Sequence, residues 1–412
     1  MSSHKKGPKV VICGYYGFGN CGDEAVLLAI IHSFKKLNPD IRITVLSNAP
    51  KTTSEHYDVT AVQRWNPFRA LLVIMSCNVL ISGGGSLLQD VTSSKSLMYY
   101  LSIIRIALFL RKRVFIYCQG IGPLIEEKNR SRVAKTLSRC SAITVRDDHS
   151  AVLLRELGIT KDVEITNDPV MTFDRVSFVG EDINPILKRL GIPSYSTEDG
   201  SPKPLMIAII RPWGDNTHLA PVADFLDSQV LHGWDVLLVP AYFEQDIDIL
   251  TGIGQIMNRR HHILEECLTA QQFITLVSSA DCVLSMRLHG LICAMAMEVP
   301  MLALSYDPKV EAFMKQAGLE KFCFQYDEFN REAAERALFG SNGLVGHDSS
   351  DNPEISIDSA DSTDGPNNLH ALNNLPQMPI QKNEEQRLKM HTQAWATAKN
   401  VVEILKLNVN NH

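Results

Sequence analysis

Four side chains that can do chemistry each stand at or just beyond the end of a short apolar run of the sequence: Arg146, Arg287, His289 and Lys309. An arginine guanidinium binds phosphate and carboxylate through paired, charge-assisted hydrogen bonds. A histidine titrates near neutrality, so it can give and take protons. Together these residue types predict a site that holds a small anionic molecule and moves protons on it. For Arg146, an ion pair with the adjacent Asp147 or Asp148 is an equally good interpretation.

Three glycine-rich segments also follow apolar runs, at residues 14–24, 82–90 and 119–123. Glycine lets backbone N–H groups approach a ligand closely, so a phosphate, a sugar ring or a carboxylate can lie against such segments. The first segment lacks the lysine of a P-loop and the spacing of a dinucleotide-binding loop, which argues against ATP and NAD. Three such segments in one half of the chain predict a wide pocket.

Other polar residues give weaker indications of a functional site. Asp246 and Asp248 imitate a metal-binding motif of some glycosyltransferases, but they fall inside a helical pattern and are interpreted as solvated surface. His261 and His262 lack a spacing that suits a metal, so we expect no metal. The nine cysteines stand mostly in apolar runs and are expected to be buried, reduced thiols of a cytosolic protein.

Short β-branched apolar runs alternate with longer amphipathic segments, which is typical of parallel sheets covered by helices on both faces. In the first half the predicted strands are 9–13, 41–46, 79–82, 114–119 and 142–145, and the predicted helices are 23–36, 96–111, 126–138 and 147–157. In the second half the predicted strands are 205–210, 235–239, 282–285 and 301–304, and the predicted helices are 220–231, 245–257, 269–278, 289–297 and 309–316. The sequence therefore predicts an α/β protein of two doubly wound units. In such sheets ligands bind beyond the carboxyl ends of the strands, where the four side chains stand.

The 412 residues exceed what one core organises, so we expect two domains, 1–175 and 176–340, with a site in the cleft between them. Residues 341–383 are rich in Asn, Asp, Ser, Pro and Gly without a period, and they predict a disordered or weakly ordered acidic insertion. In the last segment, 384–412, a helix is predicted. Its apolar stripe needs a surface to cover: Leu388, Trp395, Ala398, Val401, Val402 and Leu405.

Charge is distributed unevenly along the chain. The net charge is −6, yet residues 1–170 carry 22 Lys and Arg against 14 Asp and Glu, a balance of +8. A basic first half suits an anionic substrate or an anionic membrane surface, and no basic run with interleaved aromatics predicts nucleic-acid binding. A simple charge dipole explains the balance equally well.

The segment 96–113 raises the question of a membrane. Its apolar stretch is too short to span a bilayer, and Arg105 interrupts it. It is interpreted as a helix packed on a sheet; the alternative is an interfacial helix that ends in Arg111, Lys112 and Arg113. The first residues, MSSHKKGPKV, lack the apolar core of a secretion signal, so a cytoplasmic protein is expected.

Six motifs occur together in this chain: GxxGxGNxGDEA at 14–25, ISGGGSLLQD at 81–90, QGIGP at 119–123, VRDDHS at 145–150, MRLHG at 286–290 and SYDPKV at 305–310. This set resembles the polysaccharide pyruvyl transferase family, from residue 9 to about 317. MRLHG and the triple-glycine segment are the most discriminating parts. Within the family the motifs are most similar to the cell-surface-anchoring branch, the CsaB type.

The resemblance implies a GT-B-like fold of two Rossmann-type domains with an interdomain cleft and a terminal helix that crosses back onto the first domain. It implies transfer of pyruvate from phosphoenolpyruvate, a substrate, with no cofactor. The implied acceptor is an N-acetylmannosamine residue of a lipid-linked secondary cell wall polysaccharide precursor, which receives a 4,6-linked ketal. We therefore expect an enzyme at the inner face of the cytoplasmic membrane, held there by the anionic lipid surface.

Site residues are carried over from the resemblance by position. Those implied to bind the donor are Arg146, Arg287, Leu288 and Lys309, and those implied to act in catalysis are His289 and Arg287. Those implied to bind the acceptor are Gly17, Asn20, Asp23, Gly83, Gly84, Gly85 and Gln119. The chemistry agrees, because phosphoenolpyruvate carries two anionic groups that need two or three fixed cations. A histidine can protonate its C3 and then help to remove the protons of the sugar hydroxyls.

Two other functions stay open. One is a sugar-nucleotide glycosyltransferase of the same fold, since a fold does not fix a function. It needs a nucleotide-diphosphate pocket, and the motifs of the second half offer no acidic residue for a ribose. The other is a non-catalytic protein that binds the cell envelope.

Overall fold

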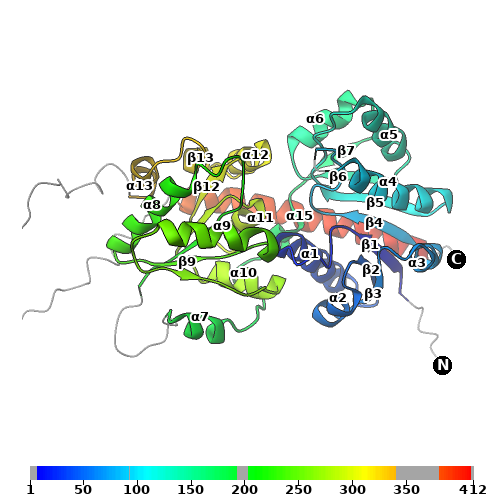
Figure 1. Ribbon diagram of the computed structural model, residues 1–412. Helices are drawn as coiled ribbons and strands as arrows, with labels where there is room; N and C mark the ends of the chain where they lie inside the picture. The colour runs from blue at the N-terminus through cyan, green and yellow to red at the C-terminus, as the bar shows by residue number, and fades with distance from the viewer. Residues whose placement is uncertain (1–6, 92, 193–202, 340–379, 410–412) are drawn as a thin grey trace, which may run out of the picture.

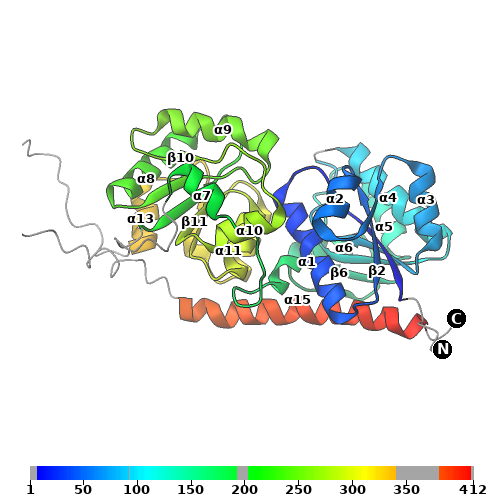
Figure 2. The ribbon, with the colours of Figure 1, turned by 90° about the horizontal axis from the view of Figure 1, so that it is seen from below.

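The computed structural model describes residues 7–91, 93–192, 203–339 and 380–409. Two parallel β-sheets stand side by side, each with helices on both faces (Figure 1). One long helix, α15 (Ile380–Val409), runs beneath both of them (Figure 2). The prediction of two doubly wound α/β units is therefore confirmed.

The first sheet has seven parallel strands in the order β3-β2-β1-β4-β5-β6-β7. These strands are β1 (Lys9–Cys13), β2 (Arg42–Ser47), β3 (Thr60–Gln63), β4 (Val79–Gly83), β5 (Arg113–Gln119), β6 (Ala142–Val145) and β7 (Val163–Ile165). The order reverses between β1 and β4, which are paired although two strands separate them in the chain. Ligands of doubly wound sheets bind at this kind of reversal, and two of the glycine-rich segments follow these two strands.

The second sheet has six parallel strands in the order β10-β9-β8-β11-β12-β13. These strands are β8 (Leu205–Ile209), β9 (Asp235–Leu238), β10 (His262–Ile263), β11 (Cys282–Ser285), β12 (Met301–Ser305) and β13 (Cys323–Gln325). Here the order reverses between β8 and β11. The strand β11 leads directly to Arg287 and His289, so these side chains also stand at a reversal point.

Helices of the first unit are divided between the two faces of its sheet. One face is covered by α1 (Cys21–Leu37) and α2 (Pro50–Tyr57). The other is covered by α3 (Pro67–Ser76), α4 (Ser94–Phe109), α5 (Glu127–Leu137) and α6 (Asp148–Glu156). Buried Leu97, Leu101 and Ile104 turn α4 toward the sheet, which confirms the interpretation of this segment as a packed helix. None of the described helices is long and apolar enough to cross a membrane.

Helices of the second unit follow the same pattern. They are α7 (Asn184–Leu190), α8 (Leu219–Leu231), α9 (Phe243–Ile256), α10 (Ala270–Ser278), α11 (Leu288–Ala296), α12 (Pro308–Gln316) and α13 (Arg331–Phe339). Short 3₁₀ turns lie at η1 (Pro169–Thr172) and η2 (Glu320–Phe322). One continuous hydrophobic core joins α1, η1, α11 and α15, so the two units are packed against each other.

The terminal helix α15 links the two units. Arg387 forms an ion pair with Glu298 of the second unit, and further along Thr397 bonds with Thr166 of the first. The helix has the predicted apolar stripe, but Leu388 does not belong to it, because this side chain is 47% exposed. The buried apolar side chains begin two residues later and follow helical spacing: Met390, Ala394, Ala398, Val401, Val402 and Leu405.

The predicted insertion at 341–383 lies outside the described residues except for its last four. Residues 380–383 already belong to α15, so this helix begins earlier than the expected start at 384. All nine cysteines are free thiols, and seven of them are buried, as the apolar runs predict.

Candidate active site

The carboxyl edges of the two sheets meet at the first turn of α1. The amide of Cys21 donates to the carbonyl of Ala241, which follows β9, at 2.8 Å. Asn20 forms a β-bridge with Tyr242, and its side chain caps α1 by accepting from the amide of Gly22. Loops that follow strands of both sheets are thereby brought together, and the candidate residues lie around this junction.

A buried carboxylate, Asp168, is the centre of the cluster. Nη1 of Arg146 donates to Oδ2 of Asp168 at 2.9 Å, and Nε2 of His289 lies 3.5 Å from the same oxygen. Burial alone raises the pKa of Asp168, but contact with His289 and the charge of Arg146 outweigh it and lower the pKa to about 2. Asp168 is therefore ionised, and it anchors one candidate residue from each sheet.

Arg146 forms the ion pair with Asp147 that its sequence neighbourhood predicts, but at 4.0 Å this pair is longer than the one with Asp168. Asp147 also caps α6 by accepting from the amide of Ser150 at 2.7 Å. Nη2 of Arg146 donates to Oγ of Ser86, in the triple-glycine segment, at 3.1 Å. The guanidinium thus lies between Asp168 and the segment that follows β4.

His289 lies in the first turn of α11, against the backbone of α1. A Cβ on Gly22 would lie 2.4 Å from Nδ1 of His289, so glycine is required for this close approach. Nε2 is buried, and within the described residues it has no hydrogen-bond partner, since Oδ2 of Asp168, at 3.5 Å, is too distant for an ordinary hydrogen bond. A buried ring nitrogen without a partner is free to bond to a ligand.

Asp23, in the first turn of α1, lies beside the same cluster. A Cβ on Gly85 would lie 2.8 Å from its Oδ1, so the triple-glycine segment closes over this carboxyl. Burial raises the pKa of Asp23, even though the charges of His289 and Arg146 oppose this effect. A carboxyl with a raised pKa next to one with a lowered pKa is an arrangement that active sites use to separate an acid from a base.

The raised pKa of Asp23 makes a prediction about stability. Its folded-state pKa lies above the unfolded value, so the ionised form destabilises the fold at pH 7. Asp23→Asn is expected to raise the thermal midpoint at pH 7 by a few degrees, and the gain should vanish as the pH falls toward the ordinary range of aspartate. Calorimetry across pH tests this, with exposed Asp148→Asn as control. A lower midpoint at pH 7 would show that the charge of Asp23 stabilises the fold.

Arg287 is the N-cap residue of α11, and it is held by an acid that the sequence analysis misjudged. Asp246 was interpreted as solvated surface, but it is fully buried. Its carboxylate pairs with Arg287 at two nitrogens, and Nε of Arg287 lies 3.2 Å from Oδ2. The helical pattern was right, since Asp246 lies in the first turn of α9. That turn, however, faces the junction and not the solvent.

The remaining donor candidates lie nearby, outside this cluster. Nζ of Lys309 pairs with Oδ2 of Asp307 at 3.0 Å and lies over the ring of Tyr306. Among the described contacts, none joins Lys309 to Arg146, Arg287 or His289. Leu288 is buried in the first turn of α11, between Arg287 and His289 in the chain.

The predicted acceptor residues lie at the carboxyl edge of the first sheet. Several of their backbone groups already have protein partners: the amide of Gly17 donates to Glu24, and the amide of Gly84 donates to the carbonyl of Tyr117. The carbonyl of Gly83 accepts from Tyr16. Gln119 is buried and donates to Ser82, and its Oε1 has no partner among the described residues.

A further cation, Arg211, was missed by the sequence analysis. It follows β8, two residues beyond Ile209, and Arg287 stands two residues beyond the paired Ser285. Its Nη1 donates to the hydroxyl of Tyr306 at 2.9 Å, and no carboxylate forms an ion pair with it in the described part of the chain. The signal was present, since Arg211 also ends a predicted strand.

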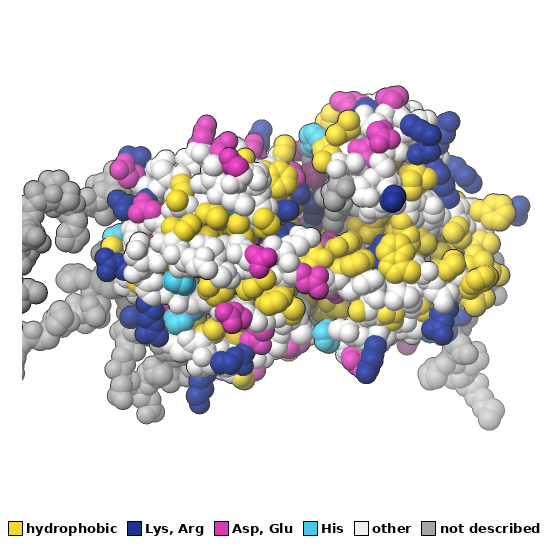
Figure 3. All heavy atoms as spheres, in the orientation of Figure 1, with side chains coloured by type: hydrophobic (Ala, Val, Ile, Leu, Met, Phe, Trp, Pro, Cys, Tyr) yellow, Lys and Arg dark blue, Asp and Glu magenta, His cyan; other side chains and the backbone are white. Residues whose placement is uncertain are grey.

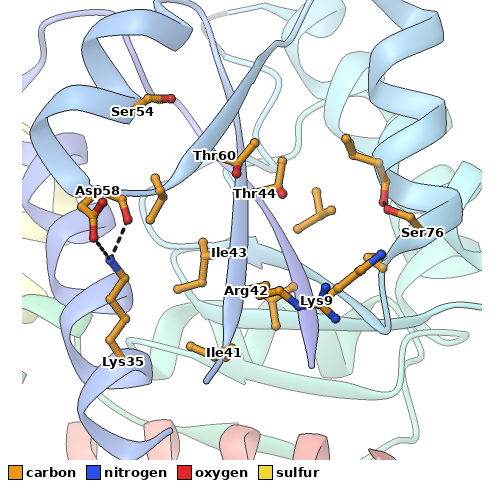
Figure 4. A pocket seen from close by; sticks show the side chains of 15 residues that line it. Lys9, Lys35, Ile41, Arg42, Ile43, Thr44, Ser54, Asp58, Thr60 and Ser76 are labelled. Carbon is orange, nitrogen blue, oxygen red and sulfur yellow. Dashed lines mark hydrogen bonds and ion pairs between the residues drawn. The ribbon is translucent and has the colours of Figure 1, made fainter. Parts of the chain in front are cut away.

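Other features do not add to this site. Within the described ranges, no group of three or more His, Cys, Asp or Glu side chains could hold a metal ion. A cavity of 610 Å³ lies at the opposite, amino-terminal edge of the first sheet, where Lys9 and Arg42 line it (Figure 4). It is therefore separate from the junction.

Two Rossmann-type units that meet at their carboxyl edges, with a terminal helix that crosses between them, define a GT-B-like protein. Solved structures agree. The fold is similar to a glycosyltransferase from Rickettsia africae, with a TM-score of 0.56, 10% identity and coverage of 98% of this chain and 100% of that one. It is also similar to a protein from Listeria monocytogenes described as a UDP-N-acetylglucosamine 2-epimerase, with a TM-score of 0.56, 14% identity and 98% of both chains covered.

The sequence identifies the family of the chain, which is a more specific statement than its fold. Residues 20–308 match the family described as polysaccharide pyruvyl transferase, and the chain belongs to this family. The match includes every residue of the Arg146, Asp168, Arg287 and His289 cluster and ends one residue before Lys309. No curated protein matches the chain.

Proposed function

We propose that this protein transfers pyruvate from phosphoenolpyruvate to a lipid-linked saccharide and releases phosphate. The observation that carries the proposal is the cluster at the junction, where Arg146 of the first unit and His289 of the second share the buried carboxylate of Asp168. The cluster joins a fixed cation to a histidine nitrogen that lies 3.5 Å from this carboxylate and has no hydrogen-bond partner within the described residues. Membership of the pyruvyl transferase family supports the same chemistry.

The donor is held by cations in this proposal. Phosphoenolpyruvate carries a phosphate and a carboxylate on three carbon atoms, and the guanidinium groups of Arg146 and Arg287 bind these anions. Each guanidinium is fixed by a buried acid, Asp168 or Asp246, so little side-chain freedom is lost on binding. Lys309 adds a third positive charge from the first turn of α12.

Proton transfers complete the reaction. His289 gives a proton to C3 of the enol phosphate, and a sugar hydroxyl adds to the electron-poor C2 as it loses its own proton to the site. A second hydroxyl of the same sugar then attacks C2 and loses its proton in turn, and the C2–O bond to phosphate breaks. His289 and Asp23 are the titratable groups placed to exchange these protons. The product is a cyclic ketal, and phosphate leaves with its bonding electron pair.

The acceptor in this proposal is an N-acetylmannosamine residue of a lipid-linked secondary cell wall polysaccharide precursor, which is the acceptor of the cell-surface-anchoring branch. The ketal joins its 4- and 6-hydroxyl groups, and the enzyme works at the inner face of the cytoplasmic membrane. The glycine-rich segments at 14–24 and 82–90 form the acceptor side, because they line the first-unit half of the junction.

Calorimetric titration tests the donor. Phosphoenolpyruvate is expected to bind, and a uridine-diphosphate sugar is expected not to. With an N-acetylmannosamine-containing lipid acceptor, phosphate release should match the amount of ketal found by mass spectrometry. Binding of the sugar nucleotide without phosphoenolpyruvate would instead identify a glycosyltransferase.

Arg211 provides a sharper test of the donor pocket. Its guanidinium lies beside Tyr306, and no carboxylate of the described residues pairs with it, so it is available for a donor anion. Arg211→Gln is expected to raise the KM for phosphoenolpyruvate about ten-fold, as loss of one charge-assisted hydrogen bond does. Arg331→Gln, on the outer helix α13, is the control and should leave the KM unchanged. An unchanged KM for Arg211→Gln would remove this residue from the pocket.

A further inference from the structure

The outward face of α3 is apolar, although a surface helix is normally polar on that side. Its large hydrophobic side chains, 38% to 79% exposed, recur at helical spacing: Phe68, Leu71, Leu72 and Met75. The opposite face, with Ala70 and Ile74, is buried against the sheet. The helix therefore has two apolar faces, and the outer one is uncovered in the described structure.

The apolar face continues beyond the helix at both ends. Trp65, just before α3, is 59% exposed, and Phe109, the last residue of α4, is 82% exposed. The end of α4 lies beside the end of α3, because Nζ of Lys112 donates to the carbonyl of Cys77 at 2.9 Å. Trp65, the four α3 side chains and Phe109 are called the α3 patch. Figure 3 shows hydrophobic side chains gathered over this part of the first unit, with lysine and arginine side chains beside them.

The segment that forms the α3 patch is rich in cations. Residues 59–125 contain seven Lys and Arg and one acidic residue, a balance of 7 − 1 = +6. The acidic residue, Asp90, accepts hydrogen bonds from the amides of Ile125 and Glu126 and from Asn129. The exposed cations are Arg69, Lys95, Arg111 and Arg113, whereas Arg64 is buried.

One end of the α3 patch touches the acceptor side of the junction. The rings of Trp65 and Tyr99 are 5.1 Å apart, and the guanidinium of Arg64 lies between Tyr99 and Phe18, at 4.3 and 5.0 Å from their centres. Phe18 belongs to the glycine-rich segment that leads into α1. A continuous run of aromatic and cation–π contacts therefore connects the patch to the loop that precedes Asn20 and Asp23.

We propose that the α3 patch is a docking surface for an anionic lipid bilayer. The six hydrophobic side chains enter the interface between headgroups and acyl chains, and the exposed cations of this segment meet lipid phosphates. The helix α4 is not the inserted helix, because its apolar side is turned to the sheet and only its last residue, Phe109, belongs to the patch. The inference rests on the proposed function in one respect only: a bilayer held here brings the saccharide of a lipid-linked acceptor to the junction.

The charge of the α3 patch favours a bilayer over a second copy of this chain as its partner. Two copies joined through the α3 patch would place the same excess of cations on both sides of the contact, and like charges repel. An anionic leaflet carries the complementary charge over a wide area. A bilayer also needs no matching surface shape, which suits a convex helix face.

Vesicle flotation tests the inference. The full-length protein is expected to float with phosphatidylglycerol vesicles at low salt and to bind phosphatidylcholine vesicles about ten-fold less well.

Phe68→Ser/Leu72→Ser should reduce binding about ten-fold or more, because both side chains are already exposed and their loss leaves the core intact. Val176→Ser/Val179→Ser is the matched control, with two apolar residues 94% and 81% exposed elsewhere, and should bind as the wild type does. Arg69→Gln/Arg111→Gln should weaken binding and its dependence on salt.

The outcomes separate docking from catalysis. Equal binding of the Phe68→Ser/Leu72→Ser variant and the wild type, or no flotation of either, would overturn the proposal. Sedimentation velocity without vesicles would also overturn it, if the wild type were a dimer that the same two substitutions convert to a monomer. Phosphoenolpyruvate titration of the same preparations reports on the proposed function separately, since vesicle binding requires no turnover.

Discussion

His289→Ala is expected to lower turnover about 10²- to 10⁴-fold, the range for loss of a general acid–base residue. Phosphoenolpyruvate affinity should change by only a few fold, because the cations that hold the donor stay in place. Asp168 keeps its hydrogen bond from Arg146 at 2.9 Å, so the variant should also fold normally. Single-turnover phosphate release and calorimetric titration measure the two effects separately.

Two further variants make this result specific. His289→Gln retains a polar side chain of similar reach that cannot titrate, so it should be about as slow as His289→Ala. His149→Ala removes an exposed histidine from the first turn of α6, near Arg146 in sequence, and should leave the kinetics unchanged. Turnover of His289→Gln close to that of the wild type would replace the acid–base role with one in binding.

Position relative to the strands was enough to find Arg146, Arg287 and His289, because the carboxyl edge of a parallel sheet gathers such residues regardless of their distance along the chain. Their partners were not found in this way. Asp168 is 22 residues from Arg146 and 121 from His289, and only the packing of η1 between α1 and α11 brings these residues together. A local pattern carries no information about that packing.

Helical periodicity has a similar limit. It placed α9 and α15 correctly, but it could not say which of two adjacent stripes faces the protein. Asp246 is buried because the start of α9 faces Arg287. Leu388 is exposed because Arg387, beside it, turns inward to pair with Glu298. Both errors concern contacts with another element, which a single segment does not encode.

Edge strands were missed for a physical reason. The strands β3, β7, β10 and β13 have two to four residues each, and none of those residues is fully buried. The apolar run that marks a central strand is therefore absent from them. The central strands that carry the site are buried on both faces, and all of these were predicted.

Arg146→Ala is expected to weaken donor binding and also to lower the free energy of unfolding. The donor loses a guanidinium partner, so phosphoenolpyruvate binding should weaken about ten-fold or more. The carboxylate of Asp168, which is 4% exposed, also loses its closest cation. Leaving a buried charge without its partner typically costs about 3 to 5 kcal/mol of unfolding free energy, measured here by chemical denaturation at pH 7. Arg146→Lys should recover only part of the donor affinity, because an ammonium cannot make a two-pronged contact.

The double variant Arg146→Ala/Asp168→Asn separates the two costs. It removes the unpaired charge, so most of the stability should return while donor binding stays weak. The pH dependence provides a second check. In the wild type the lowered pKa of Asp168 contributes stability above its unfolded pKa of about 4, and this is lost as the pH falls toward 2. In Arg146→Ala burial is opposed chiefly by His289, so the pKa of Asp168 should rise from its lowered position, and the stability penalty should be largest at neutral pH and should shrink in acid. A penalty that is constant between pH 7 and pH 4, or a double variant no more stable than Arg146→Ala, would show that the cost arises from lost packing and not from the buried charge of Asp168.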